Sequence, residues 1–232
     1  MFKLGNSEFQ MKGSSFYAGF SDDKMNVRMQ CEPKNDFSWH IDIGMEYGPL
    51  ITKLKEDDDD YDEEYDDDND EYDDDGYDDY EEVSPHLYHN NGFSLNIRSW
   101  KAIEGMSKIW EEEYNEDDEE AGGLCVFEHE DVTSGTIEFL KRQGNEFFIR
   151  WTGTANVYWD DEYGADVPFE FEGWIPFKGI FAGCDRISDR KELEQAMAEF
   201  IDISEFECVL EASHEIEGGI SYDWRYVPKD KE

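Results

Sequence analysis

"TIEFLKRQGNEFFIRW", Thr136 to Trp151, carries the pattern that decides the fold class. Apolar and polar residues alternate on both sides of "QGN", Gln143 to Asn145, with Phe139 before this segment and Phe147 and Ile149 after it. Alternation with a period of two is typical of a strand with one buried face. A short segment containing glycine between two such runs predicts a hairpin. The stretch therefore predicts two antiparallel strands joined by a tight turn.

The same alternation recurs along most of the chain. It is found in "FSWHIDI" from Phe37, in "VPFEFEGWIPF" from Val167, and in two runs near the end, from Phe206 and from Ile220, separated by "EGG". About ten strands at hairpin spacing predict antiparallel pairing, because parallel strands need a crossover element between them. We therefore expect an α+β fold that is mostly antiparallel β, a large twisted sheet or sandwich with two short helices and a long acidic insertion loop.

Two stretches have the spacing of three and four residues that predicts a helix. The first follows Ser99, a plausible N-cap, and the second follows Asp189, where Glu192 completes a pattern like a capping box. The apolar or small residues of the first are Trp100, Ile103, Ser107, Trp110 and Tyr114, and those of the second are Leu193, Ala196, Met197 and Phe200.

An aromatic stripe runs through the central strands, and a packed sheet face is the simplest explanation for it. Its members are Trp151, Trp159, Phe169, Phe171, Trp174 and Phe177. Trp174 falls out of register with Phe169 and Phe171, so we expect it at the surface as a contact residue. Pro168 and Pro176 lack the amide donor of a strand ladder, which predicts an edge strand or a bend.

Charge is the most unusual property of the sequence. The 232 residues include 61 acids and 20 bases, for a net charge of −41. The run Glu56 to Glu82 holds 20 acids in 27 residues and no base, yet the remainder still carries −21. Neighbouring carboxylates in this run lie within a Debye length of about 8 Å, so their repulsion predicts an open, disordered segment.

These observations define the expected domain organisation. Residues 1–55 and 83–232 are predicted to form a single antiparallel β-rich domain, and 56–82 a disordered acidic insertion. Sixteen Phe, 13 Tyr and 7 Trp supply the apolar surface for one core. "NDFSWHIDI" from Asn35 resembles "NEFFIRWTG" from Asn145, which leaves open two related halves, 1–98 and 99–232.

The stretch "EYDDDGYDDYEE", Glu71 to Glu82, places oxygen ligands at the offsets of a calcium loop, with Gly76 at the sharp turn. The scaffold for such a loop is missing. The segment before it has no apolar stripe, and Pro85 follows three residues after Glu82, so no helix pair can hold the loop. In so acidic a run, carboxylates at these offsets are a coincidence of composition.

Other site signatures are weak. Cys31, Cys125, Cys184 and Cys208 form no C-x-x-C pair, so we expect free thiols and neither a zinc site nor a disulfide framework. "HLYH", His86 to His89, could bind a metal but is more typical of an exposed loop. Hydrolase, phosphate-binding and dinucleotide-binding motifs are absent. We therefore expect no catalytic residue, no cofactor and no metal.

The start of the chain has no apolar segment of signal-peptide length, and no window approaches 18 apolar residues. We therefore expect a cytoplasmic protein without a membrane partner. Direct binding of nucleic acid is disfavoured, because phosphates are attracted by Lys and Arg and repelled by this surface.

Together these points predict a non-enzymatic acidic protein that neutralises a basic protein, as an immunity protein against a toxin or as a nucleic-acid mimic. A low-affinity calcium or metal buffer that uses the insertion is one alternative. An enzyme whose site is assembled from distant residues is another. The predicted partner-binding residues are Asp57, Asp58, Asp59, Asp60, Glu63, Glu64, Asp66, Asp67, Asp68, Asp73, Asp74, Asp75, Tyr77, Glu111, Glu112, Glu113, Asp117, Asp118 and Trp174.

Overall fold

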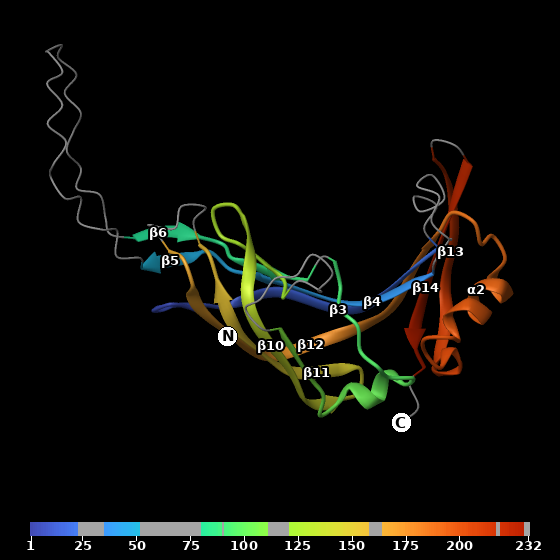
Figure 1. Ribbon diagram of the computed structural model, residues 1–232, viewed down its shortest axis with the longest axis horizontal. Coiled ribbons are helices and arrows are strands. Elements are labelled where there is room, and N and C mark those ends of the chain that lie inside the picture. Colours follow the sequence, from blue (N-terminus) through green and yellow to red (C-terminus); the bar gives the residue numbers. More distant parts are fainter. Residues whose placement is uncertain are drawn as a thin grey trace, which may run out of the picture.

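The computed structural model describes residues 1–22, 35–51, 80–89, 91–110, 121–157, 164–216 and 219–229 (Figure 1). Strands dominate these residues. They are β1 (Phe2–Leu4), β2 (Ser7–Phe9), β3 (Met11–Ser21), β4 (Asp36–Met45), β5 (Gly48–Ile51), β6 (Tyr80–Val83), β7 (His86–Tyr88), β8 (Ser107–Trp110), β9 (Gly123–Cys125), β10 (His129–Gln143), β11 (Glu146–Ala155), β12 (Val167–Cys184), β13 (Phe206–Ile216) and β14 (Gly219–Pro228). One α-helix, α2 (Arg190–Met197), and two 3-10 turns, Trp100–Ile103 and Ile203–Glu205, complete the described elements.

Twelve of the strands belong to one sheet, and its pairing closes on itself. The order β11-β10-β9-β7-β4-β3-β12 is closed by an additional pairing of β11 with β12. Among the described strands, every pair is antiparallel except β3 with β12. β5 and β6 form a separate two-stranded sheet. The predicted α+β fold with mostly antiparallel strands is confirmed, with more strands than the ten expected.

The hairpin predicted from Thr136 to Trp151 is present. β10 and β11 pair from Gln143↔Glu146 at the turn to Val132↔Ala155 at the far end. Gly144 has a φ of 59° at the turn, a conformation that glycine adopts without the Cβ clash of other residues. Alternation and turn chemistry were therefore sufficient to place this element.

β12 is the strand that allows closure, and it lies in the interior of the sheet. Its first part pairs with β11 from Val167 to Pro176, and its last part pairs with β3 and β14. The change of partner coincides with a bulge between Phe177 and Ile180, where Gly179 has a φ of 97°. Pro176 lies beside this bend, whereas Pro168 lies near the start of β12, and the edge-strand alternative is wrong for both because β12 is an interior strand.

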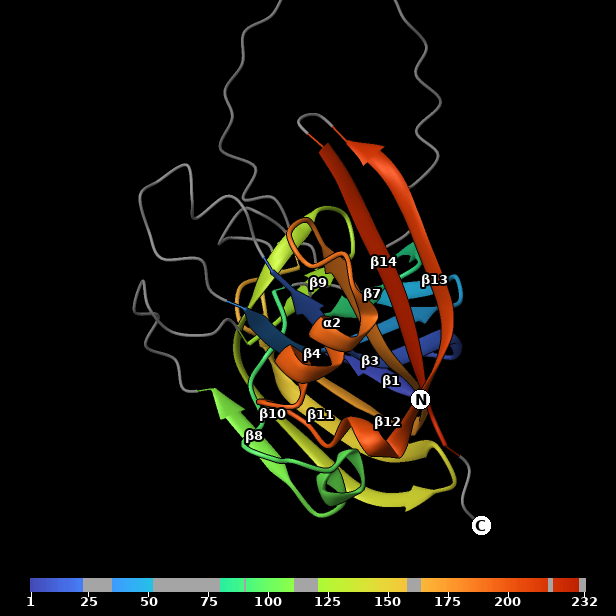
Figure 2. The same ribbon diagram turned by 90° about the vertical axis from the view of Figure 1, so that its right-hand side faces the viewer.

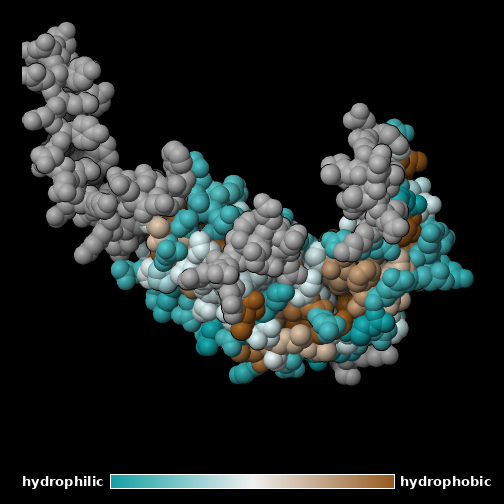
Figure 3. Space-filling view, in the orientation of Figure 1, coloured by the Kyte–Doolittle hydropathy of each residue, from teal (hydrophilic) through white to brown (hydrophobic). Residues whose placement is uncertain are grey.

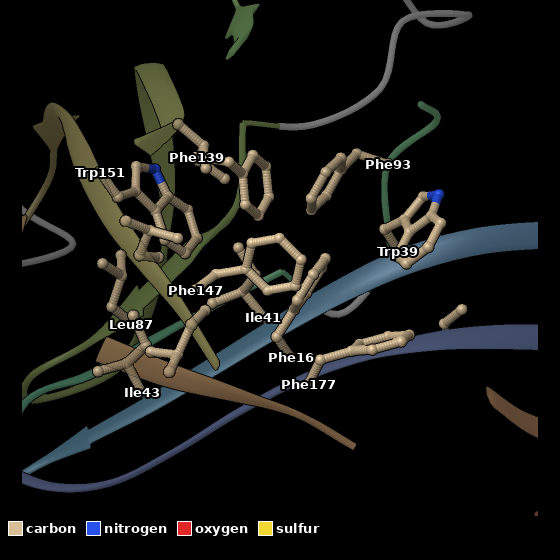
Figure 4. Packing of buried hydrophobic residues seen from close by; sticks show 14 of the residues in the cluster. Phe16, Trp39, Ile41, Ile43, Leu87, Phe93, Phe139, Phe147, Trp151 and Phe177 are labelled. Carbon is tan, nitrogen blue, oxygen red and sulfur yellow. The ribbon is translucent and has the colours of Figure 1, made fainter. Parts of the chain in front are cut away.

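The core lies inside the closed sheet and is mostly aromatic (Figure 4). Phe16 of β3 is at its centre, with ring centroids 5.4 Å from Trp39, 5.2 Å from Phe139, 5.6 Å from Phe147 and 5.3 Å from Phe177. These rings come from five strands, and each such pair adds about 0.5–1.5 kcal/mol beyond the burial of its surface. The interlocked rings fix how the two sides of the sheet meet.

The aromatic stripe predicted as core is largely confirmed. Trp151, Phe169, Phe171 and Phe177 are buried. Trp174 is 37% exposed, as its register predicted, and Trp159 lies outside the described residues. Buried residues from both ends of the sequence belong to one cluster. The division into two related halves stays a prediction.

The first predicted helix is wrong beyond its first turn. Ser99 does cap a 3-10 turn, accepting from the Lys101 amide at 3.3 Å, but this turn ends at Ile103. Gly105, with a φ of 82°, reverses the chain, and Ser107–Trp110 then pairs as β8 with β10. Buried residues in a short turn and a following strand produced the spacing of a helix. Tyr114 lies outside the described residues.

The second predicted helix is confirmed as α2. The Asp189 carboxylate caps it by accepting from the amides of Lys191 at 3.0 Å and Glu192 at 3.1 Å. Leu193 and Met197 are buried on its inner face.

Within the residues that the structure describes, no helix has the length and apolar character needed to cross a membrane.

Candidate functional site

The predicted partner-binding residues, apart from Trp174, lie outside the described part of the chain. Asp57 to Tyr77 fall within 52–79, and Glu111 to Asp118 fall within 111–120. The structure does show where the first segment is attached. Ile51 and Tyr80 are paired across β5 and β6, so the acidic segment leaves and re-enters the fold at neighbouring residues. Tyr80 to Glu82, predicted as part of the insertion, belong to β6.

The residues that flank the second acidic segment, 111–120, also lie close together. Trp110, which precedes it, pairs with Gly135 in β10. Ala121, which follows it, lies near the same glycine, since a Cβ on Gly135 would be 3.6 Å from that of Ala121. A third segment, 158–163, begins and ends at a hydrogen bond from the Val157 amide to the Gly164 carbonyl, 3.0 Å long.

Trp174 lies on the face of the sheet directed away from the core. It pairs with Phe148 across β11 and β12, with ring centroids 5.4 Å apart and planes tilted by 59°. The next outward-facing pair along these strands is Arg150 and Glu172, whose side chains are 2.6 Å apart. Trp174 is thus an exposed aromatic residue beside an ion-pair cluster, and its role as a contact residue stays a prediction.

The ion-pair cluster shows how basic side chains are used in this fold. Arg150 lies 2.6 Å from Glu172 and 3.7 Å from both Glu138 and Glu170. The hydrogen bond and the charge of Glu172 raise the pKa of Arg150 further. Other described basic residues are paired in the same way: Lys3 with Glu8, Lys101 with Glu205, Arg186 with Asp22 and Arg190 with Glu194. Because these bases contact carboxylates of the chain itself, they add no separate basic patch.

A hollow of about 420 Å³ opens on the outer face of the closed sheet, between β3 and β12. Ser15, Tyr17, Lys178 and Phe181 line it. The Tyr17 ring meets Phe181 edge-on at 5.4 Å. The guanidinium of Arg225 lies 5.2 Å from the Phe181 ring centroid on the other side. The hollow therefore combines two ring surfaces with the ammonium group of Lys178, and Arg225 lies beside it against Phe181.

Tyr17 also lies against His40, its cross-strand partner on β4. The two rings are stacked with centroids 4.9 Å apart and planes 9° apart. Burial and the nearby Asp42 carboxylate raise the pKa of the Tyr17 phenol. The hydroxyl thus remains a neutral donor at physiological pH.

Four of the five histidines lie on this outer face, each within hydrogen-bond distance of a polar side chain. His40 Nε2 is 2.9 Å from the Ser38 hydroxyl, and His86 Nε2 is 2.9 Å from Asp42 Oδ1. On the flanking strands, His129 Nδ1 is 2.9 Å from the Tyr88 hydroxyl and His214 Nδ1 is 2.9 Å from Asp223 Oδ2. The hydrogen bond and charge of Asp42 outweigh burial and raise the pKa of His86.

Glycines allow the rings of this face to lie flat on the sheet. A Cβ on Gly19 would be 2.9 Å from His40 Nε2, and one on Gly123 would be 2.5 Å from the Tyr88 ring. Any larger residue at either position would displace the ring. These glycines therefore position outer-face side chains.

The two histidines of "HLYH" are not placed to bind one metal ion together. His86 lies on the outer face, whereas His89 is buried among aromatic rings, with centroids 5.0 Å from Phe93 and 5.2 Å from Trp110. Among the residues that the structure describes, no group of three or more His, Cys, Asp or Glu side chains could hold a metal ion.

Sequence reasoning missed the outer face because its members are far apart in the chain. Each histidine occupies a polar position of an alternating strand, which predicts only solvent exposure. Cys125 lies between His86 and His129 in the register, on three different strands. The available signal was that the outward-facing positions of β3 and β4 include several small or aromatic residues, among them Ser15, Tyr17, Ser38 and His40.

Comparisons with protein-family models, with curated proteins and with solved structures found no match.

Proposed function

We propose that this protein is a non-enzymatic acidic binding protein that occupies and neutralises a basic protein. Two forms of this function fit the chemistry, an immunity protein against a toxic nuclease and a mimic of nucleic acid. In both, carboxylates take the place of phosphates on a surface rich in Lys and Arg.

The observation that carries the proposal is the placement of the acidic run between paired residues. Because Ile51 and Tyr80 are cross-strand neighbours, the run 52–79 is an excursion from one point of the fold. A dense line of carboxylates fixed at both ends attracts a cationic surface and raises association rates by roughly 10 to 10³ fold.

The rest of the chain also carries a net negative charge, which adds to the attraction for a cationic surface. The net charge is −41, of which the run 56–82 contributes 20 acids, and the remainder is still acidic. Arg150, Arg186 and Arg190 are already paired with carboxylates of the chain. A basic partner would therefore meet uncompensated acids, whereas nucleic acid would be repelled.

We place this encounter in the cytoplasm. Cys125, Cys184 and Cys208 are free thiols, which is typical of reducing compartments. Their chemistry is compatible with a protein that folds without disulfides.

The experiment that tests the proposal is a binding titration against basic probe proteins. A lysine-rich linker histone and a basic ribonuclease would be titrated at 50 and 150 mM salt, with an acidic albumin as the negative probe. We expect saturable binding to the basic probes, weaker at the higher salt, and displacement of DNA from the histone.

Two variants of the run 56–79 give the matched comparison. Changing its Asp and Glu residues to Asn and Gln should weaken binding at least tenfold. Exchanging Asp for Glu and Glu for Asp, which preserves charge, should leave binding within about twofold. The proposal is overturned if the unaltered chain binds no basic probe at 150 mM salt. Saturable calcium binding under those conditions would instead favour the buffering alternative.

A further inference from the structure

β13 is an exposed edge strand of unusual length for this fold. Among the described strands, the other edges of the large sheet are β2 with three residues and β8 with four, whereas β13 has eleven. Natural sheets keep their edges short or covered, because an edge presents unpaired amides and carbonyls to other chains. β13 pairs only with β14 among the described strands.

The β13–β14 hairpin also projects from the body of the fold. Figure 2 shows both strands extending past the ends of their neighbours. Only Phe206 of β13 is buried, while Val209 is 50% and Leu210 49% exposed. Ile216 and Ile220 are exposed near the turn, and Figure 3 shows hydrophobic surface along this ribbon among hydrophilic residues. If the only requirement on this edge were to remain unpaired, we would not expect exposed aliphatic side chains along it.

The charges of β13 are of one sign. Glu207, Glu211 and Glu215 are exposed and form no ion pair with another described residue, and β13 contains no Lys or Arg. His214 is the one residue of the strand with a basic side chain, and it contacts Asp223 of β14. A strand added at this edge would therefore place its side chains beside carboxylates.

Pairing of β13 with a second copy of itself is disfavoured by these positions. An antiparallel pair centred on Ser213, beyond the bulge between Cys208 and Leu210, would place each Glu211 opposite a Glu215. Like charges directly opposite each other destabilise a strand pair. The arrangement therefore opposes self-association and favours a strand with Lys or Arg at alternate residues.

We propose that β13 is the docking edge for an extended strand of the basic partner. This inference rests on the proposed function and names the surface at which the partner binds. The strand would pair with the outer backbone of β13 beyond the bulge between Cys208 and Leu210, place Lys or Arg beside Glu211 and Glu215, and cover Leu210 on the opposite face with its apolar residues. The acidic run would attract the partner, and β13 would fix its register.

The test uses a ten-residue peptide of alternating Lys and Val, titrated against the full chain by fluorescence anisotropy. A second peptide has the same sequence but carries N-methyl groups on alternate residues, which keeps every charge and removes backbone donors. We expect the N-methylated peptide to bind at least tenfold more weakly. Hydrogen exchange should show slower exchange of β13 amides with the first peptide only.

The matched variants are E211K/E215K on β13 and E46K/E128K at exposed positions elsewhere, with equal changes in net charge. The first should weaken binding of the peptide at least tenfold and the second by no more than about twofold. Equal binding of both peptides, or equal effects of both variants, would overturn the docking edge. So would a wild-type dimer that E211K/E215K dissociates, because β13 would then be occupied by a second copy.

The outcomes also separate this inference from the proposed function. If the linker histone binds wild type and E211K/E215K equally well, the docking edge fails and the proposed function stands. If the peptide binds at β13 but no folded basic protein binds, the edge is real and the proposed function fails.

Discussion

Asp42 and His86 join β4 to β7 on the outer face, with Oδ1 and Nε2 2.9 Å apart. The hydrogen bond favours the protonated imidazole, so the pKa of His86 in the folded protein lies above its ordinary value of 6.5. Because the folded pKa is the higher one, this pair stabilises the fold fully below about pH 6.5. The stabilisation is lost as pH rises through the folded pKa.

We predict that an NMR titration of the His86 imidazole gives a pKa above 6.5, and that Asp42→Asn lowers it. The effect on the free energy of unfolding should be well under 1 kcal/mol, because both side chains are substantially exposed and screened by water. The interpretation is wrong if the pKa of His86 is at or below 6.5 and Asp42→Asn leaves it unchanged.

A second prediction concerns Asp22, a carboxylate that is 1% exposed at the end of β3. It accepts hydrogen bonds from three successive amides after β12, those of Asp185 at 2.6 Å, Arg186 at 2.8 Å and Ile187 at 2.6 Å. Asp22→Ala should cost about 3 kcal/mol or more in urea unfolding, because three amides, that of the buried Ile187 among them, lose their acceptor.

Asp202→Ala is the control for this prediction. Asp202 is exposed and caps a 3-10 turn through the Ser204 amide at 3.0 Å, so its loss should cost about 1 kcal/mol. Asp22→Asn, which keeps one acceptor oxygen, should fall between the two. Equal costs for Asp22→Ala and Asp202→Ala would show that the three amides find other acceptors.

Local patterns predicted those parts of the fold whose partners are close in sequence. The β10–β11 hairpin and the cap of α2 depend on residues within a few positions of Gly144 and Asp189. The closure of the sheet could not be predicted in this way. It depends on β12 pairing in parallel with β3, which joins Phe177 to Phe16 across most of the chain.

The error in the first predicted helix has a similar origin. Trp100, Ile103 and Trp110 are all buried, and their spacing fits a helix if the chain continues straight. Gly105 at positive φ ends that possibility, and an isolated glycine in a helical pattern signals this only weakly. The candidate site was predicted in part. The surface position of Trp174 followed from its register, but the outer-face histidines required the pairing of strands that no local pattern supplies.

A third prediction tests the bulge that bends β12. A Cβ on Gly179 would lie 1.9 Å from the Tyr226 carbonyl oxygen, and the φ of 97° is itself unfavourable for other residues. Gly179→Ala should therefore destabilise the protein by about 3 kcal/mol or more, through backbone strain and displacement of β14.

Gly144→Ala separates these two causes. Gly144 also has a positive φ, 59°, but nothing lies within 4 Å of a Cβ built on it. Its substitution should cost only the conformational penalty of about 1–2 kcal/mol. If Gly179→Ala is no more costly than Gly144→Ala in urea unfolding, β14 does not pack on the bulge as described.

A fourth prediction concerns Cys184 at the end of β12. Burial and the carboxylates of Asp22 and Asp185 raise the pKa of this thiol to about 12, and the side chain is 1% exposed. Because the thiolate is the reactive species, Cys184 should react with an aromatic disulfide reagent at pH 8 at least about a hundredfold more slowly than an accessible thiol.

Cys125 and Cys208 are partly exposed and serve as the comparison within the same chain. In a Cys31→Ser background, two thiols should react under native conditions and a third only after addition of urea. Native modification of Cys184 at the rate of Cys125, located by peptide mass analysis, would mean that the end of β12 opens and that β14 does not cover it.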